Sequence, residues 1–595
     1  MSIHHQRLAA LRQQLETQGL DGFVVPLTDE HMSEYVGNYA QRLGWLTGFE
    51  GSAGSAAVLK DKAAIFTDGR YTLQVRAQVD AADWSYQSVP ETNVTDWLKA
   101  EAPAGARIGY DPWLHRKDWV ERTREALAGK GAELVAVDGN PVDAVWTDRP
   151  EPSKAALIVH PERLAGRSSA DKRQAVADWL GEQNADAAVL AALDSIAWTF
   201  NLRGRDVSHT PVGLAFALVH ADGTADLFVE GEKVTAELRQ HLGNGVRLHE
   251  RAAFEGALGE LGGKAVAVDP ERSVAAISEA LEAAGAKIIA LRDPTVLPRA
   301  IKNEAELAGH RAAQARDGAA MVRFLKWVGE NEGGLDELKA SDKLEAIRRE
   351  DPSLKDLSFD SISGFGPNGA IVHYRSSEKT NRSFAPGSLY LIDSGGQYED
   401  GTTDITRTLA VGEPTQEMRE RFTRVLQGHI ALAAAVFPKG TRGGQLDSFA
   451  RRPLWEAGLD YAHGTGHGVG SFLSVHEGPQ RIAPVGGAYV GGDEPLAEGM
   501  ILSNEPGYYK EGAYGIRIEN LVLVVVRDVP GAEKPMLGFE TLTFAPIDRR
   551  LVVAEMLSDR ERQWLNDYHA EVVRRIGPGL GAEERAWLER ECAAI

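Results

Sequence analysis

The sequence predicts an α/β (α+β) fold, with two similar α/β domains followed by a larger third domain. Three observations lead to this prediction. The chain of 595 residues is 43% hydrophobic, so it is long and apolar enough to bury several cores. One layout of elements occurs twice in the first half of the chain. Beyond residue 359 the pattern changes to strands divided by glycine-rich loops.

The repeated layout is an apolar strand, a loop that contains aspartate, an aromatic turn and then a hairpin. It occupies residues 21–71, as DGFVVPLTDEHMSEYV, WLTGFEGSAGSAAVL and AAIFTDGRY. It returns in residues 185–231, as ADAAVLAALDSIAWTFNLRG and VGLAFALVHADGTADLFVEGE. Two copies of one domain are the simplest interpretation. Because polar, proline-bearing segments lie near 146–154 and 291–300, we predict domains at 1–147, 148–304 and 305–595.

The third domain begins with a long predicted helix. Asn303 is a candidate N-cap, and Glu306 is spaced to complete a capping box. The segment that follows, AELAGHRAAQARDGAAMVRFLKWV, has an amphipathic helical pattern. From residue 359 to about 545 we expect strands and glycine-rich loops, and from about 549 to 595 a polar helical tail.

Composition narrows the classes of partner and the compartment. The chain has 65 basic and 86 acidic residues and a formal net charge of −21, which argues against nucleic acid or an anionic membrane as its main partner. The N-terminus has no apolar core of a signal peptide, and no stretch of about 18 apolar residues is present. Its one cysteine, Cys592, excludes a thiolate metal cluster and indicates a reducing compartment. We therefore predict a soluble, cytoplasmic protein.

The stretch HGTGHGVG, residues 463–470, places His463 and His467 four positions apart. A zinc-protease helix would put such a pair on one face, but each interposed glycine costs a helix about 1 kcal/mol. Glycine is favoured where the backbone bends sharply or approaches a ligand closely. We therefore predict that these histidines lie in an irregular segment beside a small ligand.

Two predicted hairpins place acidic residues in pairs. In LYLIDSGGQYEDGTTDITRTL, residues 389–409, a turn near Tyr398 and Glu399 would set Asp393 opposite Asp404. Opposed Cβ atoms in such a ladder lie roughly 4.5–5.5 Å apart, so the like charges need compensation. Alternatively, the register slips by one residue and both aspartates are solvated turn residues.

The second hairpin, ILSNEPGYYKEGAYGIRIENLVLVVV, covers residues 501–526. A turn centred on Gly512 sets Glu505 opposite Glu519. Arg517 shares the strand face of Glu519 and could orient a carboxylate, or it could be an ordinary surface arginine. Four carboxylates and one histidine without sulfur suit two divalent cations, of which Mn²⁺ fits best and Zn²⁺ or Co²⁺ are possible.

Several of these segments resemble a known family. GPNGAIVHY, DSGGQYEDGTTDITRT, HGTGHGVGSFLSVHEGP, SNEPGYY and GIRIEN are similar to motifs of the aminopeptidase P group of the pita-bread metallopeptidases. WLTGFEGSAGSAAV, FTDGRYTLQ, LDSIAWTFNLRG and IKNEAE extend the resemblance over the whole chain, to the long three-domain cytosolic form. The resemblance implies two creatinase-like N-terminal domains, a pita-bread catalytic domain and, by family likeness, a homodimer.

The resemblance also implies roles for individual residues. The implied metal ligands are Asp393, Asp404, His467, Glu505 and Glu519. The implied catalytic residues are His373, His476 and Glu505, and the implied substrate-site residues are His463 and Arg517. The reaction expected is release of an N-terminal residue from peptides with proline second, by a metal-activated water whose proton Glu505 takes, with both catalytic histidines donating to the oxyanion.

Three other functions fit parts of this pattern. A prolidase restricted to dipeptides would share all five implied ligands. A metal-free binding module on the same fold would have lost ligands, and none is missing here. A two-metal phosphoesterase would need a basic cluster to hold phosphate, and no such cluster accompanies the acidic pairs.

Overall fold

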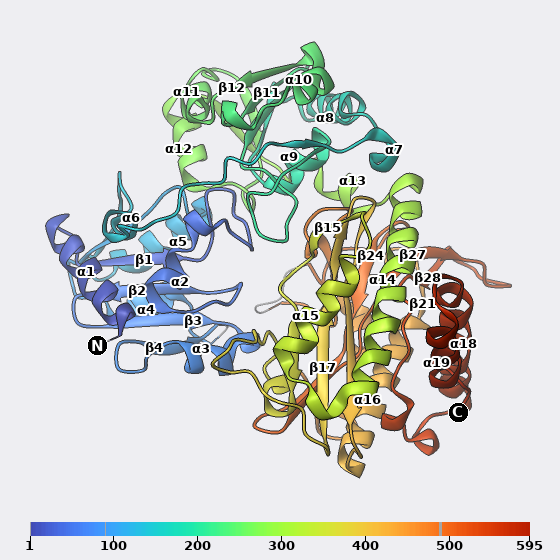
Figure 1. Ribbon diagram of the computed structural model, residues 1–595. Helices are drawn as coiled ribbons and strands as arrows, with labels where there is room; N and C mark the ends of the chain where they lie inside the picture. Colours follow the sequence, from blue (N-terminus) through green and yellow to red (C-terminus); the bar gives the residue numbers. More distant parts are fainter. Residues whose placement is uncertain (1, 90, 487–490) are drawn as a thin grey trace. The chain divides into compact units, whose positions relative to one another are not determined.

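The computed structural model of the chain describes residues 2–89, 91–486 and 491–595. It divides into two compact units, Met1–Val296 and Leu297–Ile595. Figure 1 colours the first unit from blue to green and the second from green to red. Both units combine helices with β-sheets, so the predicted α/β (α+β) class is confirmed. Within the described residues, none of the helices has the length and apolarity to cross a membrane.

The first unit contains two six-stranded sheets with the same topology. The first has the order β4-β3-β2-β1-β5-β6 and the second has the order β12-β11-β10-β8-β13-β14. In each, the central strand pairs antiparallel with the next sheet strand along the chain and parallel with a later one. The predicted duplication is therefore confirmed in strand order and in pairing sense.

The elements of the first unit follow the repeated layout. The strands of the first sheet are β1 (Gly22–Pro26), β2 (Ser55–Leu59), β3 (Ala63–Thr67), β4 (Ser85–Ser88), β5 (Arg107–Tyr110) and β6 (Glu133–Ala136). Those of the second are β8 (Ala187–Leu190), β10 (Phe216–His220), β11 (Ala225–Phe228), β12 (Val246–His249), β13 (Ala265–Val268) and β14 (Lys287–Ala290). A short pair is formed by β7 (Ile158–Val159) and β9 (Leu202–Arg203).

Helices cover both faces of these sheets. In the first half they are α1 (Ile3–Thr17), α2 (Arg42–Thr47), α3 (Thr72–Gln78), α4 (Val94–Glu101), α5 (Lys117–Ala128) and α6 (Pro141–Val145). In the second half they are α7 (Glu162–Ala165), α8 (Ser169–Gln183), α9 (Leu193–Thr199), α10 (Ala236–Leu242), α11 (Phe254–Gly259) and α12 (Ala275–Ala283). Phe23 and Val25 of β1 pack in one apolar cluster and Val24 in another, because alternate residues of a strand face opposite sides.

Helix α13 (Val296–Ala300) spans the sequence boundary between the two units, and the first long helix of the second unit is α14 (Glu304–Asn331). The side chain of Asn303 accepts from the backbone N–H groups of Ala305 and Glu306, and the capping box with Glu306 is complete. This confirms the predicted start of the helix. The other helices are α15 (Glu337–Arg348), α16 (Gln416–Ala433), α17 (Gly443–Trp455), α18 (Asp559–Ile576) and α19 (Ala582–Glu591).

Among the residues that the structure describes, the strands of the second unit form four sheets. They are ordered β15-β18-β19, β16-β17-β20, β21-β28-β27-β24-β22-β23 and β25-β26. Their bounds are β15 (Leu354–Leu357), β16 (Ile362–Phe365), β17 (Ser388–Ser394), β18 (Gly396–Tyr398), β19 (Gly401–Thr402), β20 (Ile405–Val411), β21 (Val436–Pro438), β22 (Gly466–Gly468), β23 (Glu477–Ile482), β24 (Ile501–Asn504), β25 (Gly507–Lys510), β26 (Tyr514–Arg517), β27 (Asn520–Arg527) and β28 (Met536–Thr541).

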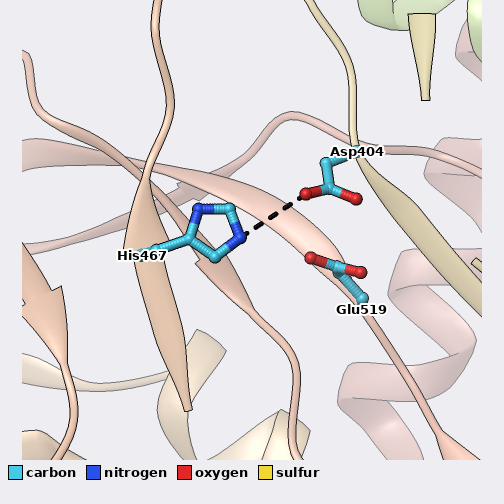
Figure 2. Close-up of side chains that lie close together, drawn as sticks. All are labelled: Asp404, His467 and Glu519. Carbon is cyan, nitrogen blue, oxygen red and sulfur yellow. Dashed lines mark ion pairs between the residues drawn. The ribbon is translucent and has the colours of Figure 1, made fainter. Parts of the chain in front are cut away.

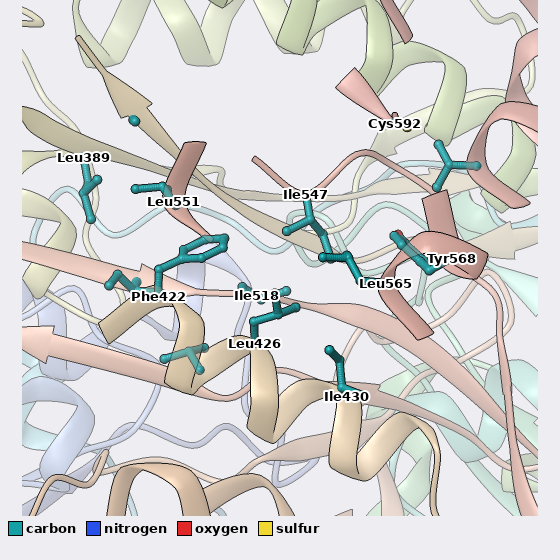
Figure 3. Packing of buried hydrophobic residues seen from close by; sticks show 14 of the residues in the cluster. Leu389, Phe422, Leu426, Ile430, Ile518, Ile547, Leu551, Leu565, Tyr568 and Cys592 are labelled. Atoms are coloured by element: carbon teal, nitrogen blue, oxygen red, sulfur yellow. The ribbon is translucent and has the colours of Figure 1, made fainter. Parts of the chain in front are cut away.

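Helices α16 and α17 correct the expectation that residues 359 to about 545 hold strands and loops alone. Phe422, Leu426 and Ile430 recur every four residues along α16 and form an apolar face. Figure 3 shows that face packed in one cluster with residues of α18 and with Cys592. The polar C-terminal tail, predicted to be helical, therefore contributes α18 and α19 to the core of this unit.

Candidate metal centre

The second hairpin has the register that the sequence predicts. Strands β24 and β27 pair Asn504 with Asn520, and β25 and β26 pair Gly507 with Arg517. Both ladders have one common register, so Glu505 and Glu519, which lie between them, occupy facing positions. Gly512 is at the turn with φ 71°, a left-handed conformation that favours glycine.

The first hairpin has a different register from the predicted one. Strands β17 and β20 pair Asp393 with Thr406, not with Asp404. The tip pairs Tyr398 with Gly401, so the turn is centred between Glu399 and Asp400, later than predicted. A Cβ atom at Gly395 would lie 1.9 Å from the Thr403 carbonyl oxygen, so only glycine permits the close crossing before β18. In this register Asp404 lies opposite Gly395, so the two aspartates are diagonal neighbours across the hairpin and do not face each other directly.

As the sequence predicts, the glycine-rich stretch does not form a helix. Its residues 466–468 form β22, which lies between β23 and β24. A Cβ atom at Gly466 would lie 2.0 Å from the Ser503 carbonyl oxygen, and one at Gly468 would lie 2.4 Å from that of Glu477. The glycines thus let three strands approach closely, and His467 extends from the middle of them.

Asp404, His467 and Glu519 converge in a buried cluster (Figure 2). One ligand atom from each lies within 4.8 Å of the others. The Nε2 atom of His467 is 3.5 Å from Asp404 Oδ2 and 3.5 Å from Glu505 Oε1. Because Nδ1 of the same ring is 2.9 Å from the Gly468 carbonyl oxygen, its proton belongs on Nδ1, and the Nε2 lone pair faces the two carboxylates.

The carboxylates in this cluster disfavour one another. The pKa of Asp404 is well above its usual range because of burial first and then the charges of Asp393 and Glu505. The pKa of Glu519 is raised in the same way, by burial and then by Asp404 and Asp393. Such a set needs either bound protons or cations to neutralise it.

The donor atoms fit divalent cations. Among the described residues, Asp393 Oδ1 and Asp404 Oδ1 are buried and have no hydrogen-bond partner. Carboxylate oxygens and one imidazole nitrogen, without sulfur, are the ligand types that Mn²⁺, Co²⁺ and Zn²⁺ accept. Thr406 Oγ1 donates to Glu519 Oε2 over 2.7 Å, and Ser503 Oγ donates to Glu505 Oε1 over 3.1 Å, so hydroxyl groups orient both glutamates.

Arg517 is buried and belongs to this site. Its Nη2 donates to Asp393 Oδ2 over 2.7 Å, and its Nη1 donates to the Tyr509 hydroxyl over 2.7 Å. Burial alone would lower the pKa of Arg517, but Tyr509 and Asp393 outweigh it and raise that pKa. The alternative of a surface arginine is therefore wrong.

Tyr509 connects Arg517 to His463 and was not predicted. Its hydroxyl lies 2.8 Å from His463 Nε2, while His463 Nδ1 lies 2.7 Å from the Gly464 carbonyl oxygen. The hydroxyl therefore accepts from Arg517 and donates to His463. The available signal was Gly507, two residues before Tyr509 on the same strand face, where a Cβ atom would lie 2.6 Å from the Tyr509 hydroxyl oxygen.

The two remaining histidines lie on separate loops. The ring of His476 is 4.3 Å from that of His467, measured between centroids, at an interplanar angle of 68°. His373 is half-buried in the turn after the short helix η7 (Gly366–Ala370). That helix packs on β26, where a Cβ atom at Gly515 would lie 1.7 Å from the Gly369 carbonyl oxygen.

Comparison with known sequences places the chain in a family. The creatinase/prolidase N-terminal domain matches residues 7–145 and again 148–306. Metallopeptidase family M24 matches residues 308–525, and its C-terminal region matches 535–595. The chain is 41% identical over 616 residues to the probable Xaa-Pro aminopeptidase P of Aspergillus clavatus, covering 99% of this chain and 93% of that one. The chain is an M24 metallopeptidase of the aminopeptidase P group. It is therefore a hydrolase.

Solved structures agree with this assignment. The M24 chain superposes on the X-prolyl aminopeptidase of Caenorhabditis elegans with a TM-score of 0.94 and 33% identity, over 100% of both chains. That protein is described as a cytosolic enzyme with a dinuclear active site. The prolidase of Pyrococcus horikoshii matches with a TM-score of 0.51 and 25% identity, over 63% of this chain and 99% of its own. Its likeness thus leaves more than a third of this chain unmatched.

Proposed function

We propose that this M24 chain removes the N-terminal residue from peptides whose second residue is proline, using two divalent cations. The observation that carries the proposal is the buried convergence of Asp404, His467 and Glu519, with Glu505 beside them. Its support is the full-length similarity to proteins named for this reaction. The proposed ligands are Asp393, Asp404, His467, Glu505 and Glu519.

The proposed roles follow from where each side chain lies. When bound, two such cations lower the pKa of a water molecule and polarise the scissile carbonyl group. Glu505 is the proposed base, whose Oε1 takes the water's proton and returns it to the leaving nitrogen. His476, beside His467, and His373 are proposed to donate hydrogen bonds to the developing oxyanion. Arg517 holds Asp393, and His463 is proposed to contact the substrate.

An Xaa-Pro bond makes a dedicated site necessary. The nitrogen of an Xaa-Pro bond carries no hydrogen, and the proline ring fixes φ. A peptidase whose site accepts a hydrogen bond from the N–H of that residue therefore finds no donor there. A site that recognises the free amino terminus and the carbonyl group avoids this requirement. We further propose Mn²⁺ as the native metal, because oxygen donors dominate the set, with Zn²⁺ or Co²⁺ as alternatives.

The setting of the enzyme is also proposed. We propose a cytoplasmic homodimer that acts on peptides and has neither nucleic acid nor a membrane as partner, in keeping with the net charge of −21. The proposed domain limits remain 1–147, 148–304 and 305–595, the last with a helical tail from about 549.

A dipeptidase of the prolidase type is the alternative within this family, and a metal-free binding module is the alternative outside it. The prolidase match covers 63% of this chain, whereas the aminopeptidase matches cover nearly all of it. Retention of the buried acidic cluster, whose carboxyl pKa values are raised by mutual repulsion, argues against a binding module. Such a cluster has no use without the cations that neutralise it.

Metal content and peptide hydrolysis test the proposal together. The wild type and Asp404→Asn should be compared for bound metal and for cleavage of an Xaa-Pro-Pro peptide and of Gly-Pro. Glu399→Gln, at a half-buried position in the same hairpin, is the matched control. We expect Asp404→Asn alone to lose metal and turnover, and the wild type to prefer the longer peptide. Unchanged occupancy and turnover in Asp404→Asn would overturn the assignment, and a preference for Gly-Pro would favour the dipeptidase.

A further inference from the structure

A buried polar network lies behind the glutamates of the candidate metal centre. Its central member is Arg407 of β20, which is 1% exposed. Nη1 of Arg407 donates to the carbonyl oxygen of Glu519 over 2.8 Å and to that of Thr406 over 2.9 Å. The Glu519 N–H in turn donates to the Thr406 carbonyl over 3.2 Å. One guanidinium therefore joins the backbone of the first hairpin to the backbone of Glu519 in the second.

The other side of Arg407 is held by the C-terminal part of the chain. Its Nε donates to the Pro546 carbonyl over 3.1 Å, and its Nη2 lies 2.9 Å from the Ala545 carbonyl and 2.8 Å from the hydroxyl of Tyr568 in α18. The five N–H donors of a guanidinium all have acceptors in this arrangement. Burial lowers the pKa of Arg407, so the hydrogen-bond acceptors around it are needed to keep the charge in place.

Tyr568 is fixed in turn by its surroundings. Its ring stacks on Trp564 at a centroid distance of 5.3 Å and an interplanar angle of 3°. Its hydroxyl accepts from Arg407 and from the Ala545 N–H, at 3.2 Å, and can donate to the carbonyl oxygen of Ala545, at 3.0 Å. Removal of this hydroxyl would leave Nη2 of Arg407 with fewer acceptors in a buried space.

His429 of α16 extends the network to the second glutamate. Its Nδ1 lies 3.1 Å from the Asn504 carbonyl oxygen, next to Glu505, and its Nε2 lies 3.2 Å from Asn520 Nδ2. The amide oxygen of Asn520 accepts from Nη2 of Arg407 over 2.9 Å. His429 thus ties Asn504, which precedes Glu505, to Asn520, which follows Glu519, and Asn520 is held in turn by Arg407.

We propose that Arg407 and Tyr568 are positioning residues that set the carboxylates of Glu505 and Glu519 for metal binding, so that helix α18 is part of the frame of the metal centre. This inference rests on the proposed function, because it takes Glu519 as a ligand. Groups that orient metal ligands typically change metal affinity or activity about 10- to 100-fold when removed. The C-terminal region therefore acts on the reaction through the backbone of Glu519, without touching the substrate.

The test uses the full-length chain and Co²⁺, whose visible absorption reports the geometry of its ligands. The variants are Tyr568→Phe, Arg407→Lys and the control Tyr390→Phe. Tyr390 is fully buried in the same unit, and its hydroxyl lies 2.8 Å from Ser363 Oγ. We expect Tyr568→Phe to weaken Co²⁺ binding at least about 10-fold, to alter the absorption bands and to lower kcat more than it raises KM. Arg407→Lys should have a larger effect, and Tyr390→Phe should match the wild type in affinity and spectrum.

Two results would overturn the inference. One is a Tyr568→Phe variant with the Co²⁺ affinity and spectrum of the wild type. The other is an equal loss of Co²⁺ affinity in Tyr568→Phe and Tyr390→Phe, which would indicate general destabilisation. Unfolding of the metal-free variants measures that destabilisation. Asp404→Asn separates this failure from failure of the proposed function: if the wild type binds Co²⁺ and Asp404→Asn does not, the metal centre stands and only the role of α18 falls. A wild type without Co²⁺ binding would overturn both.

Discussion

The two acidic hairpins of the second unit bring carboxylates together in different ways. In the second hairpin, two regular ladders flank Glu505 and Glu519 in one register, so simple counting from Gly512 pairs them. In the first hairpin, the ladders β17–β20 and β18–β19 also share one register, but it is shifted by two residues from direct pairing of the aspartates, so that Asp393 faces Thr406. The second hairpin therefore sets its carboxylates directly opposite one another, whereas the first sets them diagonally across the ladder.

The largest expected effect comes from removing a carboxylate charge. Glu519→Gln keeps the side-chain volume but loses the charge that faces His467, and we expect kcat/KM to fall about 10³-fold, since metal catalysis contributes several kcal/mol. Asp404→Asn in the first hairpin should lose as much, because both hairpins serve one centre. Steady-state kinetics and metal analysis measure this, with Glu540→Gln of β28 as the control. A large difference between Glu519→Gln and Asp404→Asn would show that the hairpins do not share the centre.

A smaller effect is expected for Tyr509→Phe in the second hairpin. The change removes the hydroxyl that accepts from Arg517 and donates to His463. Removal of such an outer partner typically costs about 10- to 100-fold in metal affinity or activity. The neighbouring Tyr508→Phe is the control, because Tyr508 packs against Tyr514 on the opposite face of the strand. If kcat/KM for the two variants were equal, the hydrogen bonds that connect Arg517, Tyr509 and His463 would have no role in the reaction.

The carboxyl pKa values make the stability of the metal-free protein depend on pH. Asp404 and Glu519 have raised pKa values when folded, so the folded chain binds more protons than the unfolded chain above their ordinary values of 3.8 and 4.5. The stability that these groups contribute is therefore greatest at low pH. It falls as pH rises from their ordinary pKa values through their raised ones, by about 1.4 kcal/mol per pH unit for each excess proton. Thermal unfolding with a chelator should show the fall, and added Mn²⁺ or the double variant Asp404→Asn/Glu519→Gln should flatten it. If the stability of the chelated wild type fell with pH no more steeply than that of the double variant, this account would be contradicted.

The smallest effect concerns the turn of the second hairpin. Gly512→Ala places a Cβ atom in open space but keeps φ at 71°, so we expect a loss of unfolding free energy of about 1 kcal/mol from backbone strain alone. Gly105→Ala, with the same φ and the same open space in the first unit, is the matched control. Both should lose similar stability and keep activity within about threefold, since two ladders hold the register. A larger loss of activity for Gly512→Ala would mean that the turn, and not the ladders, sets the register.

Sequence reasoning reached the parts of this molecule that follow regular periodicity. The duplicated sheets, the capped helix at Asn303 and the register around Gly512 all obey local rules. The register at Asp404 failed because the turn lies between Glu399 and Asp400, one position later than expected, which moves the partner of Asp393 by two residues. Tyr509 was missed because its partner His463 comes from a distant segment, although its other partner, Arg517, lies in the same hairpin. Helix α16 was missed because the glycine-rich loops on either side dominated the pattern.

The single cysteine gives the protein a built-in probe of its C-terminal helices. Cys592 follows α19, is 8% exposed and packs in the same cluster as Tyr568. Burial raises the pKa of its thiol to about 12, so almost no thiolate is present to react with alkylating reagents while α18 and α19 remain packed. The rate at which the Cys592 thiol is labelled therefore reports how often this region opens, and no engineered tag is needed to measure it.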